Sequence, residues 1–395
     1  MIKILIVCLG LSVFIYSGYG IAYNTVENHF IYYYIVYLIA ILAPVAYINR
    51  RNVLNTTAET TLDSLLIHSR STVALFAYIY LFCIAVPLFY PNFQLFDALT
   101  FKMNLMAEFF DNKRILKNSF VGIIDSLSNL VLPFFFIYLA RLKNEGKNKK
   151  VLALILLFIF LIYGRILYLA RNQMLVFGVF LYITIFALKN SKIHINRKHI
   201  FVLVSILMLL VPFLFNYTFI RQGNSSLNIS YTEILTLLLE SETGYPEYYG
   251  MLENHVNKEL GLINFILWII CLPIPSFVWH TKPAPVWNDA FTYLITGLNR
   301  GDVGYVVLLP SIMGEGLFIS GVSFFWLHAL LIGTIIGIIF RYLTRHKTLI
   351  VYSIYMIILS LTLGRGGSGS YIPSLINTSV AIVLFYFIKM KTNGR

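Results

Sequence analysis

The chain carries little charge. Only 12% of its 395 residues are Asp, Glu, Lys or Arg, whereas soluble domains contain about 25%. This excludes an ordinary soluble enzyme. Hydrophobic residues make up 58% of the chain and the mean hydropathy is +0.78, which indicates an integral membrane protein. The net charge of +13 would suit a nucleic-acid-binding protein, but the basic residues are spread over short loops between apolar segments. We therefore expect no nucleic-acid partner.

Motifs for metals and redox chemistry are also missing. The three cysteines, Cys8, Cys83 and Cys271, lie singly in apolar stretches without a CxxC or Cys/His spacing. No two Asp residues are separated by one position, so the D-x-D metal clamp of nucleotide-sugar transferases is absent. No His/Glu ligand spacing appears either. The sequence therefore predicts neither a metal nor another cofactor. It also lacks the inverted internal symmetry that transporters often show.

Long apolar segments recur along the whole chain, and a transmembrane helix needs about 20 apolar residues. The pattern predicts an all-α, polytopic membrane protein with about ten spans, forming a single membrane domain over residues 1–395. We interpret the first segment as an anchor rather than a signal peptide, because no convincing cleavage site follows it. The predicted spans are 3–20, 30–48, 71–90, 119–140, 151–169, 173–188, 200–218, 317–340, 348–364 and 371–388.

The loops between these spans differ in charge. One set is short and basic, as in RLKNEGKNKK at 141–150, and holds 19 of the 30 basic residues but only three of the 17 acidic ones. Basic loops stay in the cytoplasm, so both termini are predicted to be cytoplasmic. The other set contains the long segment 219–316, which is therefore predicted to be a large periplasmic loop. Apolar stretches at 93–110 and 262–279 are interpreted as interfacial or re-entrant; if 262–279 crosses, a second crossing near 303–313 gives about twelve spans.

Several cations lie at the predicted outer ends of spans, where burial in the membrane is costly. Arg165 is the deepest, six residues or about 9 Å along a helix from the nearest turn. The guanidinium group suits phosphate oxygens, so these side chains predict one outer cavity for a lipid-linked diphosphate. The alternative is that each arginine snorkels to lipid headgroups or pairs with a nearby acid. The cations of this set are Arg165, Arg171, Arg221, Lys282, Arg300 and Arg365.

Arg365 opens the segment RGGSGS at 365–370, just before the last predicted span. The segment lacks the spacing of a nucleotide-binding P-loop. It is either a flexible turn or a place where backbone N–H groups at a helix start help to hold an anion.

Two segments resemble one family of membrane enzymes. The chain reads PIPSFVWHTKP at 273–283 and LPSIMGEGLFISG at 309–321. This pairing resembles the O-antigen (oligosaccharide repeat unit) polymerases of the Wzy family, in which a proline-rich outer loop with Trp and Lys-Pro precedes a Gly-Glu and a later glycine. The proline-arginine step usual in the first motif reads Pro275-Ser276 here, so Lys282 and Arg300 become the candidate loop cations.

The resemblance implies a reaction and a fold. It implies a GT-C-like glycosyltransferase of the bacterial inner membrane that polymerises oligosaccharide units linked to undecaprenyl diphosphate, at the periplasmic face and without a cofactor. Membrane lipids, a flippase and a chain-length regulator are the implied partners. The implied catalytic residues are the cations Arg165, Arg221 and Arg300 and the base, for which Glu315 is the first choice and Glu242 and His280 are alternatives; Glu315 is otherwise a structural partner of an arginine. The implied substrate-binding residues are Arg171, Arg365, Lys282, His280, Trp279 and Glu242.

Three other functions are compatible with parts of the pattern. An O-antigen ligase has a similar outline and the same donor, and only the motif pairing favours the polymerase. A flippase or other transporter must present cations to both faces, yet the spans are nearly free of charge below Arg165, apart from Asp125. A structural scaffold would leave the outer arginines without a role.

Overall fold

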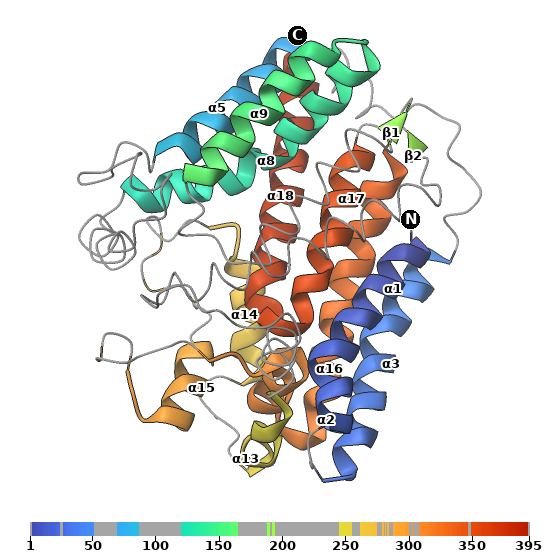
Figure 1. Ribbon diagram of the computed structural model, residues 1–395, viewed down its shortest axis with the longest axis vertical. Coiled ribbons are helices and arrows are strands. Elements are labelled where there is room, and N and C mark those ends of the chain that lie inside the picture. Colours follow the sequence, from blue (N-terminus) through green and yellow to red (C-terminus); the bar gives the residue numbers. More distant parts are fainter. Residues whose placement is uncertain are drawn as a thin grey trace, which may run out of the picture. The chain divides into compact units, whose positions relative to one another are not determined.

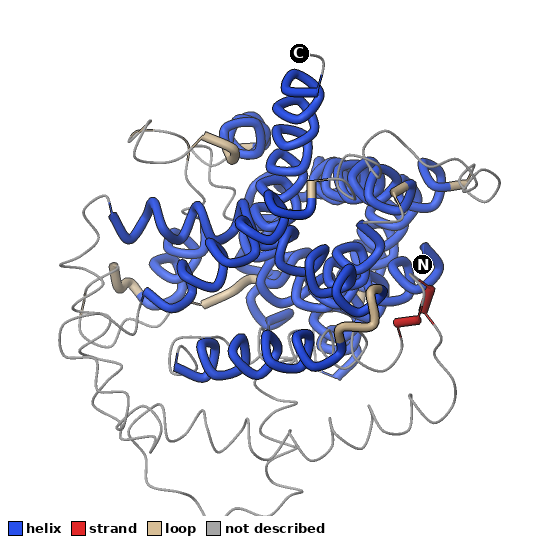
Figure 2. The backbone as a smooth tube through the Cα atoms, turned by 90° about the horizontal axis from the view of Figure 1, so that it is seen from above, coloured by secondary structure: helices blue, strands red, loops and turns tan. Residues whose placement is uncertain are grey.

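The computed structural model describes most of the predicted spans but not all of the loops. The described residues are helical except for short connections and one two-stranded hairpin (Figure 2). Residues 173–187, 200–218 and 93–110 lie outside them; these are all but the last residue of the predicted span 173–188, the predicted span 200–218 and the predicted interfacial segment. The described residues are 2–23, 27–50, 69–86, 120–164, 188–189, 192–193, 245–254, 261–274, 279, 281, 283, 287–299, 302, 308–346 and 349–393.

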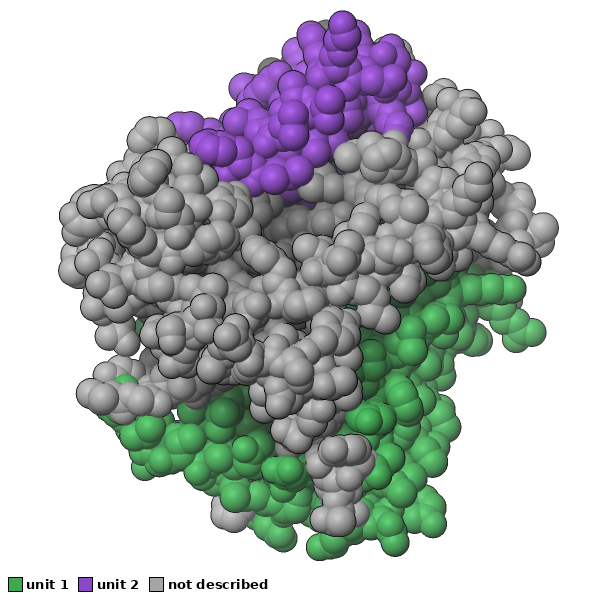
Figure 3. Space-filling view, viewed as in Figure 1, with its two compact units in different colours: residues 1–58, 237–345, 356–379 green, residues 59–236, 346–355, 380–395 purple. Residues whose placement is uncertain are grey.

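The chain divides into two compact units (Figure 3). Unit 1 comprises residues 1–58, 237–345 and 356–379, and unit 2 comprises residues 59–236, 346–355 and 380–395. That both belong to one membrane domain stays a prediction.

Unit 1 begins with α1 (Ile2–Val13), which continues through the π-helical turn η1 (Phe14–Gly18) into α2 (Tyr19–Tyr23). The antiparallel partner α3 (His29–Asn49) follows. The later elements are η5 (Tyr245–Tyr248), α13 (Tyr249–Asn254), α14 (Leu262–Cys271), α15 (Trp287–Thr296), α16 (Ser311–Arg345), the end of α17 (Ile350–Leu359), η8 (Ser360–Thr362) and the start of α18 (Leu363–Asn393).

Among the described residues, four helical segments are long and apolar enough to cross a membrane by length and composition: Ile2–Ala22, His29–Asn49, Ser311–Arg345 and Tyr371–Lys389. They coincide with four of the ten predicted spans. Helices α5, α8, α9 and α17 also lie within or around predicted spans. The stretch 262–279 contains the ten-residue helix α14, about 15 Å long, which is too short to span a membrane, as the prolines after it suggest.

Helices α3 and α16 lie side by side and run in the same direction (Figure 1). A Cβ on Gly333 would collide with the backbone oxygen of Ile41, and one on Gly337 would approach Val45. The two glycines form a GxxxG pattern, which lets helix backbones approach closely in membranes. At the end of the pair, Arg341 donates to the Ile48 carbonyl at 3.3 Å. Arg50, directly after α3, and Arg345, the last residue of α16, thus lie at the same end of the pair, which the charge pattern predicts to be cytoplasmic.

Unit 2 contains a helical layer of α5 (Arg70–Ala85), α8 (Phe120–Asn144) and α9 (Asn148–Gly164), side by side in Figure 1. It also contains residues 380–393 of α18 and the hairpin β1 (Leu188–Lys189) and β2 (Lys192–Ile193). Aromatic rings fill its interior: Phe135 lies 5.3 Å from Tyr80 and 5.0 Å from Phe158 between ring centroids.

In the predicted cytoplasmic loop of unit 2, one acidic residue binds several basic residues. Glu145 accepts from Lys147 at 2.6 Å and from Arg141 at 2.9 Å, and it pairs with Arg70 at 2.9 Å. These hydrogen bonds, from Lys147 first and Arg141 second, lower the pKa of Glu145 to about 2. The acid therefore stays ionised at any physiological pH and neutralises part of the basic loop.

Candidate functional site

A sharp turn in α16 builds the site. Gly321 has φ 68° and ψ 174°, so the helix breaks there and its first ten residues fold back. In a straight helix, Glu315 and His328 would be about 20 Å apart along the axis. Instead, Glu315 Oε1 lies 3.4 Å from His328 Nε2. Glycine is required because few other residues adopt this backbone conformation.

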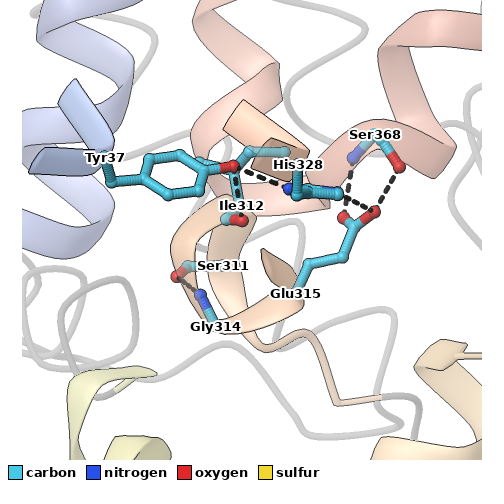
Figure 4. Close-up of polar contacts among 7 residues, drawn as sticks. All are labelled: Tyr37, Ser311, Ile312, Gly314, Glu315, His328 and Ser368. Atoms are coloured by element: carbon cyan, nitrogen blue, oxygen red, sulfur yellow. Dashed lines mark hydrogen bonds and ion pairs between the residues drawn. The ribbon is translucent and has the colours of Figure 1, made fainter. Parts of the chain in front are cut away.

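A second break lies at the start of α18, at Gly367, with φ 65° and ψ −167°. A Cβ at this position would collide with Glu315 Oε2. The glycine is therefore needed both for its backbone conformation and for the space that the Glu315 carboxylate occupies. The two breaks bring the fold-back of α16 against the first turn of the last long helix (Figure 4).

The Glu315 carboxylate is enclosed by groups of its own chain. Its Oε2 accepts a hydrogen bond from the Ser368 backbone N–H at 2.7 Å, and its Oε1 accepts one from the Ser368 hydroxyl. Glu315 is 1% exposed, and Ser368 and His328 are fully buried. The carboxylate thus caps the N-terminal turn of the helix formed by residues 368–393. Backbone N–H groups in such a turn lack helical partners, and negative charge is stabilised there.

His328 continues this network to α3. Its Nδ1 lies 3.0 Å from the Tyr37 hydroxyl, which donates to the Ile312 carbonyl at 2.9 Å. A tyrosine hydroxyl has one proton, so His328 Nδ1 must donate to Tyr37. His328 Nε2 lies 3.4 Å from Glu315 Oε1 and has no hydrogen-bond partner among the described residues.

A second set of hydroxyls fixes the fold-back at its first residue. Ser311 has φ 62°, a strained conformation for a residue with a side chain. Its Oγ lies 2.7 Å from the Tyr249 hydroxyl and 3.3 Å from Ser17 Oγ, and it accepts from the Gly314 N–H at 3.3 Å. Burial raises the pKa of Tyr249 to about 12, although the bonds to Ser17 and Ser311 act the other way. Tyr249 therefore remains protonated, and its bond to Ser311 persists.

Aromatic side chains from the long loop cover His328. Phe265 of α14 lies 4.7 Å from the His328 ring, and Trp268 stands edge-on to Trp287 at 4.9 Å, between ring centroids. Within the predicted periplasmic loop, α14 therefore packs on α16 after the break, and α15 reaches the folded-back part, where Phe291 lies 6.3 Å from Phe318 between ring centroids. These contacts fasten α14 and α15 to the end of the bundle where Glu315 lies.

A third polar cluster lies where α3 begins. Glu253 of α13 accepts from Tyr33 at 3.1 Å, and its Oε2 lies 3.0 Å from His29 Nε2. His29 Nδ1 in turn lies 3.1 Å from Glu27. This cluster joins the connection between the first two spans to the long loop, so both lie at the same end of unit 1. No pattern in the sequence indicates it, because Glu253 and His29 are 224 residues apart.

Three of the predicted site residues fall within the described part of the chain. Glu315 is at the centre of the network. Arg365 is partly exposed and lies two residues before the Gly367 break. Trp279 is 40% exposed and donates to Thr281 at 3.0 Å. The other predicted residues lie outside the described residues: Arg165, Arg171, Arg221, Glu242, His280, Lys282 and Arg300.

The sequence does not point to Tyr37 or His328, because each is a single polar residue in an apolar span; Ser368 lies in the segment RGGSGS, but its contact with Glu315 was not predicted. No group of three or more His, Cys, Asp or Glu is placed to hold a metal within the described residues. The absence of a metal from the reaction stays a prediction.

A model of the family described as O-antigen polysaccharide polymerase Wzy matches residues 3–242. No curated protein and no solved structure matches the chain. The matched residues make up more than half of the chain and cover the predicted spans up to the start of the long loop. The motifs at 273–283 and 309–321 lie outside the match, so the family assignment does not depend on them. The chain belongs to the O-antigen polysaccharide polymerase family Wzy.

Proposed function

We propose that this chain lengthens O-antigen by transferring the growing glycan from undecaprenyl diphosphate to the nonreducing end of the next lipid-linked repeat unit. Polymerisation of repeat units follows from the family; the lipid diphosphate donor and the periplasmic face are the proposal. The observation that carries it is the enclosed network around Glu315, at the end of unit 1 that faces the long loop. A flippase and a chain-length regulator are the proposed pathway partners.

The proposed reaction exchanges one glycosidic bond for another. A hydroxyl of the acceptor sugar forms a bond to the anomeric carbon of the donor glycan, and the bond from that carbon to the diphosphate oxygen breaks. The electron pair leaves with undecaprenyl diphosphate, and the acceptor hydroxyl loses its proton. Fixed cations stabilise the charge that develops on the leaving group. No nucleotide takes part, because the diphosphate link already activates the donor.

The proposed site residues form two groups, which bind different parts of the substrates. Arginine and lysine side chains hold the diphosphate, while aromatic and polar side chains of the long loop hold the sugars. The proposed cations are Arg165, Arg171, Arg221, Lys282, Arg300 and Arg365, and the proposed sugar contacts are Trp279, His280 and Glu242. Glu315 belongs to the same site.

The proposed architecture is a GT-C-like bundle of about ten spans in the bacterial inner membrane, with both termini cytoplasmic. The parallel course of α3 and α16 supports this sidedness, because basic residues lie at the same end of both: Arg50 directly after α3 and Arg345 at the end of α16. The cluster of Glu253 with His29 and Tyr33 supports it too, because it joins the first predicted outer connection to the long loop.

Replacing single cations is expected to abolish long chains. Arg165→Ala, Arg221→Ala and Arg300→Ala each remove a charge from the leaving-group site, and loss of one such electrostatic contact slows a reaction by about 10²–10³-fold. The glycan ladder on a gel should collapse to core bearing one repeat unit, with normal protein in the membrane. Arg345→Ala, at the opposite end of α16, should keep the full ladder. Full ladders from all three variants would contradict the cationic site.

A deletion strain separates polymerase from the other functions. Without the polymerase, the lipopolysaccharide should carry single repeat units on its core. Without a ligase or a flippase, the core should be bare. A scaffold is distinguished by complementation, because the arginine variants would then restore the ladder. Bare core in the deletion strain would refute the proposed function.

A further inference from the structure

We infer that Glu315 is a positioning residue for chain extension, which holds the Gly367 break in place and so fixes Arg365 at the reacting end. This inference rests on the proposed function and deepens it. It differs from the interpretation of Glu315 as the base, which the sequence motif alone suggests.

A general base must reach the proton that it removes. Its free oxygen has to come within about 2.6–3.2 Å of the acceptor hydroxyl. Both oxygens of Glu315 instead face its own chain: Oε2 accepts from the Ser368 N–H at 2.7 Å, and Oε1 accepts from the Ser368 hydroxyl and faces His328. The side chain is 1% exposed. An acceptor sugar would have to displace Ser368 before it could touch the carboxylate.

The same contacts define what Glu315 does hold. It joins two segments that are 53 residues apart in sequence. The Ser368 N–H is the first of a helix that continues to residue 393, and the carboxylate takes the place of the helical partner that such an N–H lacks. Because Gly367 has no Cβ, the Glu315 carboxylate can occupy the space beside it; a Cβ there would collide with Glu315 Oε2. Removing the carboxylate therefore removes the contact that holds the backbone at Gly367 and Ser368 in this conformation.

Arg365 precedes this break by two residues and is partly exposed. Its backbone position depends on the conformation of Gly367, because the connection between them is a single residue. Displacement of a positioning group by about 1 Å can slow an enzyme about 10²-fold. Glu315 thus acts on the reaction through the segment that carries Arg365.

The decisive comparison is Glu315→Gln against Glu315→Ala. A glutamine can present its carbonyl oxygen to the Ser368 N–H and its amide N–H groups to Ser368 Oγ and His328 Nε2, so each of these neighbours still has a partner. It cannot accept the acceptor's proton. We expect Glu315→Gln to extend chains within about tenfold of the unmodified rate, whereas loss of a base costs about 10²–10⁴-fold. Glu315→Ala should lose long chains.

The readouts are the glycan ladder of a complemented deletion strain and the extension rate in its membranes, with protein amounts measured alongside. An inactive but normally inserted Glu315→Gln protein would overturn the positioning role, as would full ladders from Glu315→Ala or from Arg365→Ala. If Glu315→Ala fails to insert, Glu315→Gln and Arg365→Ala still decide between the roles. The unmodified chain is the control for the function itself: if it restores no ladder, the proposed function fails whatever the variants do.

Discussion

Gly367→Ala is expected to reduce O-antigen to single repeat units while the protein still inserts into the membrane. The position has φ 65° and ψ −167°, a conformation that few residues except glycine adopt. The new methyl group would also meet Glu315 Oε2. The break must therefore change shape, and the segment that carries Arg365 moves with it. We expect at least about a 10²-fold loss of extension rate, measured with lipid-linked repeat units in isolated membranes.

The control is Gly369→Ala, two residues away. A methyl group on Gly369 would meet no atom within 4 Å, and the backbone there has no positive φ. The substitution removes a glycine from the same segment without a clash, so it should keep the full ladder. Equal effects of the two substitutions would show that the flexibility of RGGSGS matters rather than the contact between Gly367 and Glu315.

His328→Leu is expected to cause the largest loss of stability. His328 is fully buried and its Nε2 lies 3.4 Å from Glu315 Oε1, so its removal leaves the buried carboxylate without this neighbouring ionisable group. Breaking one side of a buried ionic pair costs about 3–5 kcal/mol. Thermal unfolding of the purified protein in detergent should show this loss.

A double variant tests the cause of that loss. Glu315→Gln added to His328→Leu removes the ionisable partner, so the double variant should be more stable than His328→Leu alone. Thr334→Val is the control on the same helix, because its exposed hydroxyl bonds to the Leu330 carbonyl within the helix. If the double variant were less stable than His328→Leu, the two side chains would not form a pair.

The membrane class and the helical spans could be predicted from the sequence because both depend on local composition. Four predicted spans coincide with helices long and apolar enough to cross. The ten-residue helix α14 is short for a reason visible in the sequence, because Pro273 and Pro275 follow it. Charge in the loops predicts which ends are cytoplasmic, and this stays a prediction; the contact of Arg341 with Ile48 shows only that α3 and α16 end on the same side.

The site was predictable only in part. The Gly-Glu motif identifies Glu315, and RGGSGS identifies the start of the last span, but nothing local indicates that the two meet. Their contact depends on positive φ angles at Gly321 and Gly367, and a glycine in a sequence does not reveal which conformation it adopts. Tyr37 and His328 escape a sequence-based prediction because each is a single polar residue in an apolar span, and only the packing of α3 on α16 brings them together.

Reconstitution of the purified protein tests the central claim most directly. The protein would be placed in liposomes with undecaprenyl-diphosphate-linked repeat units and no nucleotide sugar, and the lipid products would be separated by mass. We expect a series of glycans that differ by whole repeat units, with one undecaprenyl diphosphate released for each bond formed. Unchanged substrate beside correctly folded protein would contradict a polymerase that works from its lipid-linked donor alone.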